Sequence, residues 1–198
     1  MTHRFNHFIP LFLGVLLLLS CDPKDPNPQP EKLDFSCIQM FDGHGQDMGI
    51  YGGCTQSPDW GQITLTSEEN AFLDFPDTVG VAGTVAANIT EVFIAPNPVI
   101  RDGVLAFYLR STGTDQPVKL KVAIIDEDKN VLSRYSLRVN TDQGVYFHLA
   151  ANVYAPGKYY RLYYRASAQG DASLFEGYGN ILICKQQVVN GNIEGDCF

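Results

Sequence analysis

Polar and apolar residues alternate along much of the chain with the period of two that marks strands with one buried face. In residues 118–125 every second side chain is apolar, and two lysines fall between them. Residues 131–139 show the same pattern, with two arginines on the polar face. The polar run at 126–130 separates these segments and predicts a hairpin turn.

Other short segments combine β-branched or aromatic residues with turn residues at their ends. They are residues 62–66, 91–95, 104–110, 145–149, 158–166 and 180–184. Seven or eight strands at this spacing predict an all-β fold, an antiparallel β-sandwich. Little helix is expected beyond a single turn at residues 67–72.

The composition agrees with a turn-rich globular domain. The 198 residues include 18 Gly and 11 Pro, and 45% of the chain is hydrophobic, which suffices for one core. The formal net charge of -8 argues against nucleic-acid binding, because phosphate contacts need an excess of clustered Lys and Arg.

The first 21 residues predict an exported, lipidated protein. Residues 8–19 are an apolar run of twelve that follows Arg4; such a run is too short to span a bilayer and is typical of a signal peptide. The four residues that end at Cys21, Leu-Leu-Ser-Cys, resemble the lipobox of bacterial lipoproteins. This resemblance implies cleavage before Cys21 and lipidation of its thiol, with palmitate as an acyl chain. The alternative is an ordinary signal peptide cut nearby, with Cys21 as an incidental thiol.

Residues 22–32 carry four prolines and no large apolar side chain, which predicts an extended tether. At ~3.1 Å per residue, such a segment holds a domain ~30 Å from its anchor. Its acidic start at Asp22 resembles the charged signals that direct lipoproteins of the Bacteroidota to the cell surface. The expected location is the cell envelope, lipid-anchored in the outer membrane, with surface exposure favoured over a periplasm-facing position. The expected parts are a signal peptide at 1–20, the lipidated cysteine and tether at 21–32, and a single β-sandwich domain at 33–198.

Three short motifs lie within residues 94–166. They are a Pro-Asn-Pro opening at 96–98, a hairpin that begins at Asp126, and a Gly-x-Tyr strand at 157–159. Together they resemble the C-terminal sorting domain of type IX secretion substrates, which implies an immunoglobulin-like sandwich and a Bacteroidota source. A sorting role is not expected, because the chain departs from the pattern of these domains in two ways. Lys129-Asn130 replaces the usual turn glycine, and thirty-two residues follow Ala166.

Four cysteines remain after Cys21, namely Cys37, Cys54, Cys184 and Cys197. An even number in an exported chain predicts two disulfides, for which three connectivities are possible. Local pairing, Cys37 with Cys54 and Cys184 with Cys197, is favoured. A zinc site is not expected, because no two cysteines have the close spacing of metal-ligand pairs.

Catalytic residues are not expected. Only His44 and His148 follow the tether, and the chain has no Gly-x-Ser-x-Gly, no His-Glu-x-x-His and no phosphate-binding glycine loop. His148 is expected to point outward from a strand as a polar surface residue. Residues 42–47 are interpreted as a glycine-rich turn, since the alternating oxygen ligands of a calcium loop are missing. The sequence therefore predicts a non-enzyme without cofactor or bound metal.

One candidate binding surface follows from the alternation of residues 158–166. If Tyr160, Leu162 and Tyr164 face the core, the opposite face carries an exposed row. This row consists of Tyr159, Arg161, Tyr163 and Arg165. Tyrosine and arginine favour contacts with glycans or proteins. The alternative is stabilisation of neighbouring strands through stacking.

Two functions from different classes are consistent with these features. The first is a non-catalytic binding or adhesion module, anchored to the membrane through its lipid, that contacts a glycan or an envelope or host protein. The alternative is a structural accessory subunit of an outer-membrane secretion or gliding complex. A modification is also expected, because Asp77-Thr78-Val79 resembles the O-glycosylation acceptors of the Bacteroidota, with Thr78 as the modified residue.

Overall fold

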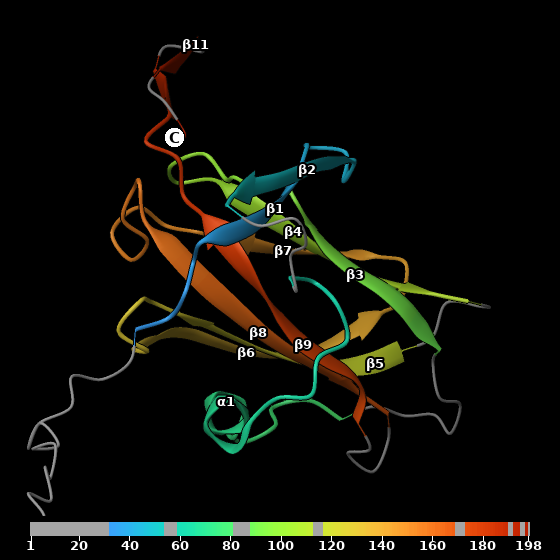
Figure 1. Cartoon of the computed structure of the whole chain (residues 1–198). Coiled ribbons are helices and arrows are strands. Elements are labelled where there is room, and N and C mark those ends of the chain that lie inside the picture. Colours follow the sequence, from blue (N-terminus) through green and yellow to red (C-terminus); the bar gives the residue numbers. More distant parts are fainter. Residues whose placement is uncertain are drawn as a thin grey trace, which may run out of the picture. The chain divides into compact units, whose positions relative to one another are not determined.

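Two antiparallel sheets dominate the computed structural model of the chain (Figure 1). The structure describes residues 32–53, 59–80, 88–112, 117–168, 173–189, 192–194 and 197. The first sheet, in the order β3-β4-β7, consists of β3 (Ile89–Ala95), β4 (Val104–Ser111) and β7 (Gly144–His148). The second, in the order β6-β5-β8-β9, consists of β5 (Pro117–Ile125), β6 (Val131–Asn140), β8 (Tyr159–Ser167) and β9 (Ser173–Leu182). The predicted all-β fold is confirmed, and the described residues contain one short helix, α1 (Ser67–Phe72).

The two sheets enclose one hydrophobic core. Ile94 and Phe107 of the three-stranded sheet meet Leu120 and Leu162 of the four-stranded sheet in it, and all four side chains are fully buried. Burial of each such side chain stabilises the fold by ~1.5–3 kcal/mol. A second, smaller cluster lies on the opposite face of the four-stranded sheet, around Tyr163. The four-stranded sheet is therefore covered on both faces.

The hairpin turn between β5 and β6 lies where the sequence predicts it. Asp126 organises this turn, since its carboxylate accepts hydrogen bonds from the N–H groups of Asp128 (3.0 Å) and Asn130 (2.8 Å). Lys129 takes the left-handed conformation, with a φ of 65°, that glycine usually provides. The missing turn glycine therefore does not prevent the hairpin.

Several strands differ from the prediction. Residues 62–66 are not a strand; the Ile63 N–H donates to the Glu176 carbonyl of β9 (2.8 Å), and the chain then turns into α1. β9 begins at Ser173, well before the predicted residue 180. Two hairpins were not predicted. They are β1 (Cys37–Phe41) with β2 (Asp47–Gly52), and β10 (Gln187–Val189) with β11 (Asn192–Glu194). β2 is largely exposed, so it lacks the apolar face on which such a prediction depends.

The single helical turn predicted at residues 67–72 is confirmed as α1. Thr66 caps it: the Thr66 hydroxyl accepts a hydrogen bond from the Glu69 N–H (3.3 Å), and the Glu69 carboxylate accepts one from the Thr66 N–H (2.8 Å). This reciprocal arrangement is a capping box, which satisfies two donors at the helix start.

Residues 59–80, called the strap below, run along the edge strand β9, where Trp60 packs into the core, and then cross the outer face of the four-stranded sheet. At β9 the Trp60 N–H donates to the Tyr178 carbonyl (2.9 Å). At β6 the Thr78 hydroxyl donates to the Ser136 carbonyl (3.1 Å). Between these points α1 and the residues after it lie over β8 and β5 (Figure 1). The strap thus spans all four strands, although its sequence predicts regular structure for only part of it.

The Pro-Asn-Pro sequence at 96–98 joins β1 to β9. Both prolines follow cis peptide bonds, and the Asn97 side chain between them is fully buried. Its amide group donates to the carbonyls of Gln39 (2.7 Å) and Asn180 (2.9 Å), and its oxygen accepts from the Leu182 N–H (3.2 Å). One side chain therefore links two strands that belong to different sheets.

A disulfide joins Cys184 to Cys197, which confirms the predicted local pairing of these two residues. Cys37 is also disulfide-bonded. Its predicted partner, Cys54, lies outside the described residues, as do Cys21 and the tether up to residue 31. Within the part of the chain that the structure describes, no helix is long and apolar enough to cross a membrane.

Candidate binding surface

The predicted row on β8 is not an open surface. As expected, Tyr160 and Tyr164 lie in the core on the opposite face of the strand. The row itself, however, lies beneath the strap and the first described residues of the chain: Arg161 is only 8% exposed and Tyr163 is 0% exposed. The expectation of an exposed binding row is therefore wrong, because the sequence pattern does not predict what covers the outer face.

The residues of this row form contacts inside the protein instead. Arg161 donates to the Asn180 side chain (2.9 Å) and the Asp34 carbonyl (2.7 Å). Tyr163 packs against Phe72 of α1, with ring centroids 5.2 Å apart, and burial raises the pKa of its hydroxyl. The two ends of the row are partly buried and also have partners. They are Tyr159, which stacks on Phe35, and Arg165, which pairs with Glu176. These contacts agree with the alternative interpretation of the row, in which its side chains stabilise neighbouring strands through stacking.

The other polar candidates are simple surface features. Asp42 accepts hydrogen bonds from the N–H groups of His44 (2.8 Å) and Gln46 (2.9 Å), which lowers the pKa of its carboxyl, so residues 42–47 form the predicted turn. His148 points outward as predicted and lies 3.2 Å from Asp102, with both side chains more than half exposed. Among the described residues, no group of three His, Cys, Asp or Glu side chains is arranged to hold a metal ion.

The predicted O-glycosylation residue, Thr78, lies at the end of the strap. It is exposed, and its hydroxyl donates to the Ser136 carbonyl. The carboxylate of the neighbouring Asp77 forms ion pairs with the ammonium groups of Lys119 (2.7 Å) and Lys121 (3.2 Å). These contacts lower the pKa of the Asp77 carboxyl. These contacts fasten the strap to β5 and β6.

A row of aromatic side chains, of which Tyr146 is exposed, lies on a different surface, the outer face of the three-stranded sheet. Phe93 of β3 stacks on Tyr108 of β4 with ring centroids 4.8 Å apart, and Tyr108 hydrogen-bonds to Tyr146 of β7. Phe41 lies 5.8 Å from Phe93 at the other end. These four residues are called the aromatic row below. The Arg110 guanidinium lies over the Phe93 ring, 4.7 Å from its centroid.

Exposure increases along the aromatic row toward β7. Phe93 is buried, since Gly45 lies so close to its ring that a Cβ there would be 2.4 Å away. Tyr108 is half-buried, whereas Tyr146 is 67% exposed. Burial, followed by the hydrogen bond to Tyr146, raises the pKa of the Tyr108 hydroxyl. Tyr146 therefore has a fixed neighbour at its hydroxyl and a ring that is open to solvent.

Two small residues give the tyrosines room. Gly144 is the cross-strand partner of Tyr108, and a Cβ on Gly144 would lie 2.8 Å from the Tyr108 ring. Ala106 is the cross-strand partner of Tyr146. The alternation in residues 145–149 indicates that Tyr146 points away from the core. Only the strand register shows that small residues stand opposite both tyrosines. Sequence reasoning therefore missed this surface.

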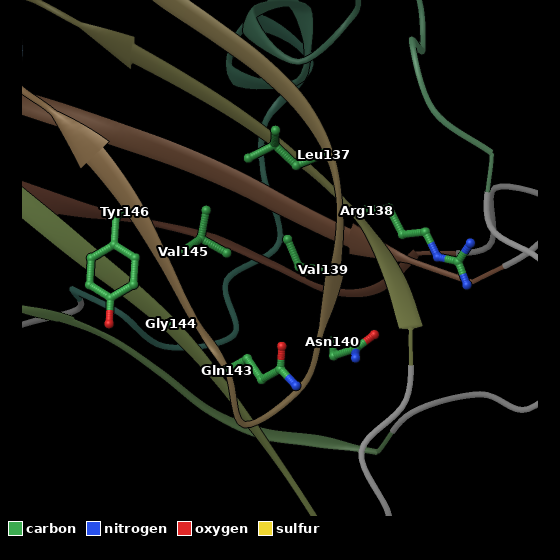
Figure 2. Close-up of a pocket in the computed structure, with 8 residues that line it drawn as sticks. All are labelled: Leu137, Arg138, Val139, Asn140, Gln143, Gly144, Val145 and Tyr146. Atoms are coloured by element: carbon green, nitrogen blue, oxygen red, sulfur yellow. The ribbon is translucent and has the colours of Figure 1, made fainter.

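A groove runs beside Tyr146 along the open side of the sandwich, between the edge strands β6 and β7 (Figure 2). Its volume is about 660 Å³. Eight residues line it: Leu137, Arg138, Val139, Asn140, Gln143, Gly144, Val145 and Tyr146. The aliphatic side chains of this set pack against the core and form the floor. Figure 2 shows Arg138 and Tyr146 pointing away from the groove on opposite sides, with Asn140 and Gln143 near the turn that joins the strands.

A second cavity of about 410 Å³ lies at the other end of β6, beside the β5–β6 turn. Its acidic residues already have cationic partners. Lys32 lies 3.2 Å from Asp128, and Lys158 lies 3.5 Å from Glu127. Leu33 donates its N–H to the Glu127 carbonyl at the same place (3.2 Å), so this is the end at which the described chain begins. The groove beside Tyr146 is therefore the more open of the two sites toward a ligand.

No protein-family model, curated protein or solved structure matches this chain. The functional argument therefore rests on the sequence and on the arrangement of the described residues. An aliphatic floor between two edge strands, with polar side chains at one end, has the elements of a binding site for a small ligand.

Proposed function

We propose that this chain is a lipid-anchored lipoprotein of the cell envelope, of the Bacteroidota type, whose sandwich is a non-catalytic binding or adhesion module. The observation that carries the proposal is the sequence Leu-Leu-Ser-Cys, which ends at Cys21 directly after a twelve-residue apolar run. Two or more acyl chains on that cysteine anchor a protein stably, whereas a single chain does so only weakly.

An immunoglobulin-like identity of the sandwich is part of the proposal. Three strands facing four in antiparallel order support it. So does Tyr160, near the start of β8, whose hydroxyl accepts a hydrogen bond from the Ala155 N–H (2.6 Å), five residues upstream. A tyrosine bonded back to the preceding loop recurs in immunoglobulin-like domains. Residues 94–166 thus share their fold, and not their sorting role, with the sorting domains that they resemble.

The position of the groove suits a displayed binding module. The chain enters the sandwich beside the β5–β6 turn, where Leu33 bonds to Glu127. The groove ends at the turn after β6, and the ten residues of β6 extend over ~30 Å at ~3.3 Å per residue. The groove and the point where the described chain begins therefore lie at opposite ends of β6.

The anchor is tested by metabolic labelling with a clickable palmitate analogue in cells that express the native chain. We expect label on the wild-type protein and none on Cys21→Ala, because the thiol is the attachment point. Cys37 is disulfide-bonded, and a matched Cys37→Ala variant keeps Cys21 and should stay labelled. Equal labelling of wild type and Cys21→Ala would refute lipidation at this residue.

Surface display is tested by protease treatment of intact cells, with a periplasmic protein as marker. Loss of the sandwich while the marker survives supports an outward-facing adhesion module. Protection in intact cells, with digestion only after lysis, would contradict surface display. In that case, crosslinks to an outer-membrane barrel would favour the accessory-subunit role in secretion or gliding.

A further inference from the structure

We infer that β7 binds an extended peptide segment of a partner protein, which adds a strand to the open edge of the three-stranded sheet. The inference rests on the binding function proposed above and adds the surface and the kind of partner. It depends on the backbone edge of β7, on the groove on one face of that edge, and on the exposed Tyr146 ring on the other face.

The two sheets have four edge strands, and three of them are bonded or protected. β9 is bonded to the strap, because the Trp60 N–H donates to the Tyr178 carbonyl (2.9 Å). β6 is also bonded to the strap, since the Thr78 hydroxyl donates to the Ser136 carbonyl (3.1 Å). β3 has a shift of register near its start and carries an exposed charge, Glu91. Both features protect a strand edge from further pairing.

β7 has no such protection, and its edge presents backbone hydrogen-bonding groups. Its sequence, Gly-Val-Tyr-Phe-His, has no proline, lysine or acidic residue, and its register with β4 is regular. The Leu149 N–H donates to the Gly103 carbonyl (2.9 Å), which continues this register. Successive residues of an antiparallel pair point toward the partner strand and away from it in turn, so Gly144, Tyr146 and His148 direct their backbone groups away from β4. Each of them offers a further strand one donor and one acceptor.

A strand beside β7 would contact both the groove and the Tyr146 ring, although these lie on opposite faces of the sheet. Successive side chains of a strand point to opposite faces. A ligand residue opposite Val145 would point inward, onto the apolar floor formed with Leu137 and Val139. The residues on either side of it would point outward, beside the Tyr146 ring, which is 67% exposed. One extended peptide thus accounts for the open floor and for the exposed ring.

The groove indicates where the peptide needs an apolar residue. Tyr135 packs against Phe147 with ring centroids 4.8 Å apart, which fills the space between the sheets beyond Val145. We therefore expect the apolar side chain of the peptide to lie opposite Val145, where its burial contributes ~1.5–3 kcal/mol. A β-branched or aromatic residue beside Tyr146 adds ~0.2–1 kcal/mol as a cross-strand pair.

A folded partner fits this edge less well than an extended peptide. A stable protein interface buries about 800 Å² on each side. The large apolar side chains exposed on β4 and β7 are Val104 and Tyr146, and an aromatic side chain buries no more than ~150–250 Å². Strand addition needs less apolar area, because main-chain hydrogen bonds supply much of its affinity.

A second copy of this chain is also disfavoured. β6 and β7 flank the same groove and are joined by residues 141–143. If two copies paired through β7, their β6 strands would approach each other as well. Each β6 carries two exposed arginines, Arg134 and Arg138, so like charges would meet. A single peptide strand does not have this conflict.

The test uses the full mature lipoprotein in detergent micelles and an array of eight-residue peptides in which apolar and polar residues alternate. Retained peptides are labelled, and their affinity is measured by fluorescence anisotropy. Methylation of single backbone nitrogens then separates strand addition from binding through side chains alone. We expect methylation of the nitrogens that face β7 to weaken binding by about tenfold or more, and methylation of the alternate ones by less than about threefold.

Two variants at one position test the protein side of these hydrogen bonds. His148→Pro removes an N–H from the edge of β7, where proline is compatible with an edge strand. His148→Ala is the matched control, because it removes the same imidazole and keeps the N–H. We expect His148→Pro to weaken binding by about tenfold or more, and His148→Ala by less than about twofold.

Hydrogen exchange measured by NMR locates the peptide on the wild-type protein, so it does not depend on how a variant folds. The amides of Gly144, Tyr146 and His148 should exchange quickly in the unbound protein. A retained peptide at saturation should slow their exchange by about tenfold or more, because they then donate to the added strand.

Four results overturn the inference. They are an array that retains no peptide, equal effects of methylation at both sets of nitrogens, unchanged exchange at Tyr146 on binding, and equal losses of affinity in His148→Pro and His148→Ala. Self-association that slows exchange at Tyr146 without peptide would also overturn it, because a second copy would then occupy the edge. Circular dichroism melts of both variants exclude unfolding as the cause.

Failure of this inference and failure of the proposed function are distinguishable. Palmitate labelling and protease accessibility do not involve β7. A labelled, surface-exposed protein that retains no peptide would overturn the strand-addition site alone. A protein that binds peptides along β7 but lacks label on Cys21 would overturn the anchor alone.

Discussion

The Asn97 side chain allows a direct test of how β1 is held against the sandwich. In Asn97→Ala, the carbonyls of Gln39 and Asn180 and the N–H of Leu182 each lose a hydrogen-bond partner. A buried polar group left unsatisfied costs ~1–3 kcal/mol. Gln39 is only half-buried and regains some solvation, so we expect the free energy of unfolding to fall by ~3–5 kcal/mol. Equilibrium urea unfolding of the mature protein measures this change.

Asn88→Ala is the matched control. Asn88 is exposed and makes one hydrogen bond to the Thr112 hydroxyl (2.8 Å), so its loss should cost less than ~1 kcal/mol. Equal losses in Asn97→Ala and Asn88→Ala would refute the view that the buried asparagine joins β1 to β9. A loss in Asn97→Ala of under ~1 kcal/mol would refute it as well.

Asn97→Asp adds a pH dependence of known sign. Its carboxylate would face two carbonyl oxygens in a buried position, so burial and these neighbours raise its pKa above that of the unfolded chain. At low pH the aspartic acid is neutral in both states, and the deficit relative to wild type is smallest there. The deficit grows as the pH rises through the folded-state pKa. A deficit that stays constant between pH ~4 and ~8 would contradict the burial of this site.

Three further predictions concern other parts of the fold. Asp77→Asn should lower the free energy of unfolding by ~1–3 kcal/mol, because Lys119 loses a charged partner. Since the Asp77 pKa is lowered in the folded state, the wild-type advantage over this variant should vanish as acid titrates the carboxyl; urea unfolding at pH 7 and pH 3 checks both points. Removal of the Cys184–Cys197 disulfide in the double alanine variant should cost ~2–3 kcal/mol, because it closes a loop with a sequence separation of 13; non-reducing urea unfolding measures it. Burial raises the pKa of Tyr154 to about 12, so stability should fall as the pH rises above the usual tyrosine pKa of 10, and absorbance at 295 nm should show late, cooperative ionisation.

The sequence predicts the sandwich well where one face of a strand is buried. Residues 118–125 and 131–139 alternate because Leu120 and its equivalents face the core, and they form β5 and β6 with the predicted turn. The prediction fails where both faces are exposed. β2 has almost no buried side chain, so nothing in its sequence separates it from a loop.

The binding surface was harder to predict because it depends on tertiary cover. Alternation correctly separates the two faces of β8, yet it says nothing about whether the outer face is covered. Arg161 and Tyr163 lie under segments more than eighty residues away along the chain. Conversely, Tyr146 gives no stronger sequence signal than any outward residue of a strand, and its exposure follows from its place on β7, the uncovered edge strand of the three-stranded sheet.

The contrast between the two outer faces leads to a functional argument. The four-stranded sheet carries buried lysine, arginine and tyrosine side chains on its outer face, and such groups are tolerated only with partners. The strap supplies those of Lys119 and Tyr163, and Asp34 and Asn180 supply those of Arg161. The three-stranded sheet is covered at Phe93 by the β1–β2 hairpin but not at Tyr146. An exposed aromatic ring gains free energy when something covers it. If the strap's role is structural, as its contacts indicate, a ligand for this protein should lie on the uncovered outer face of the three-stranded sheet, at the Tyr146 ring.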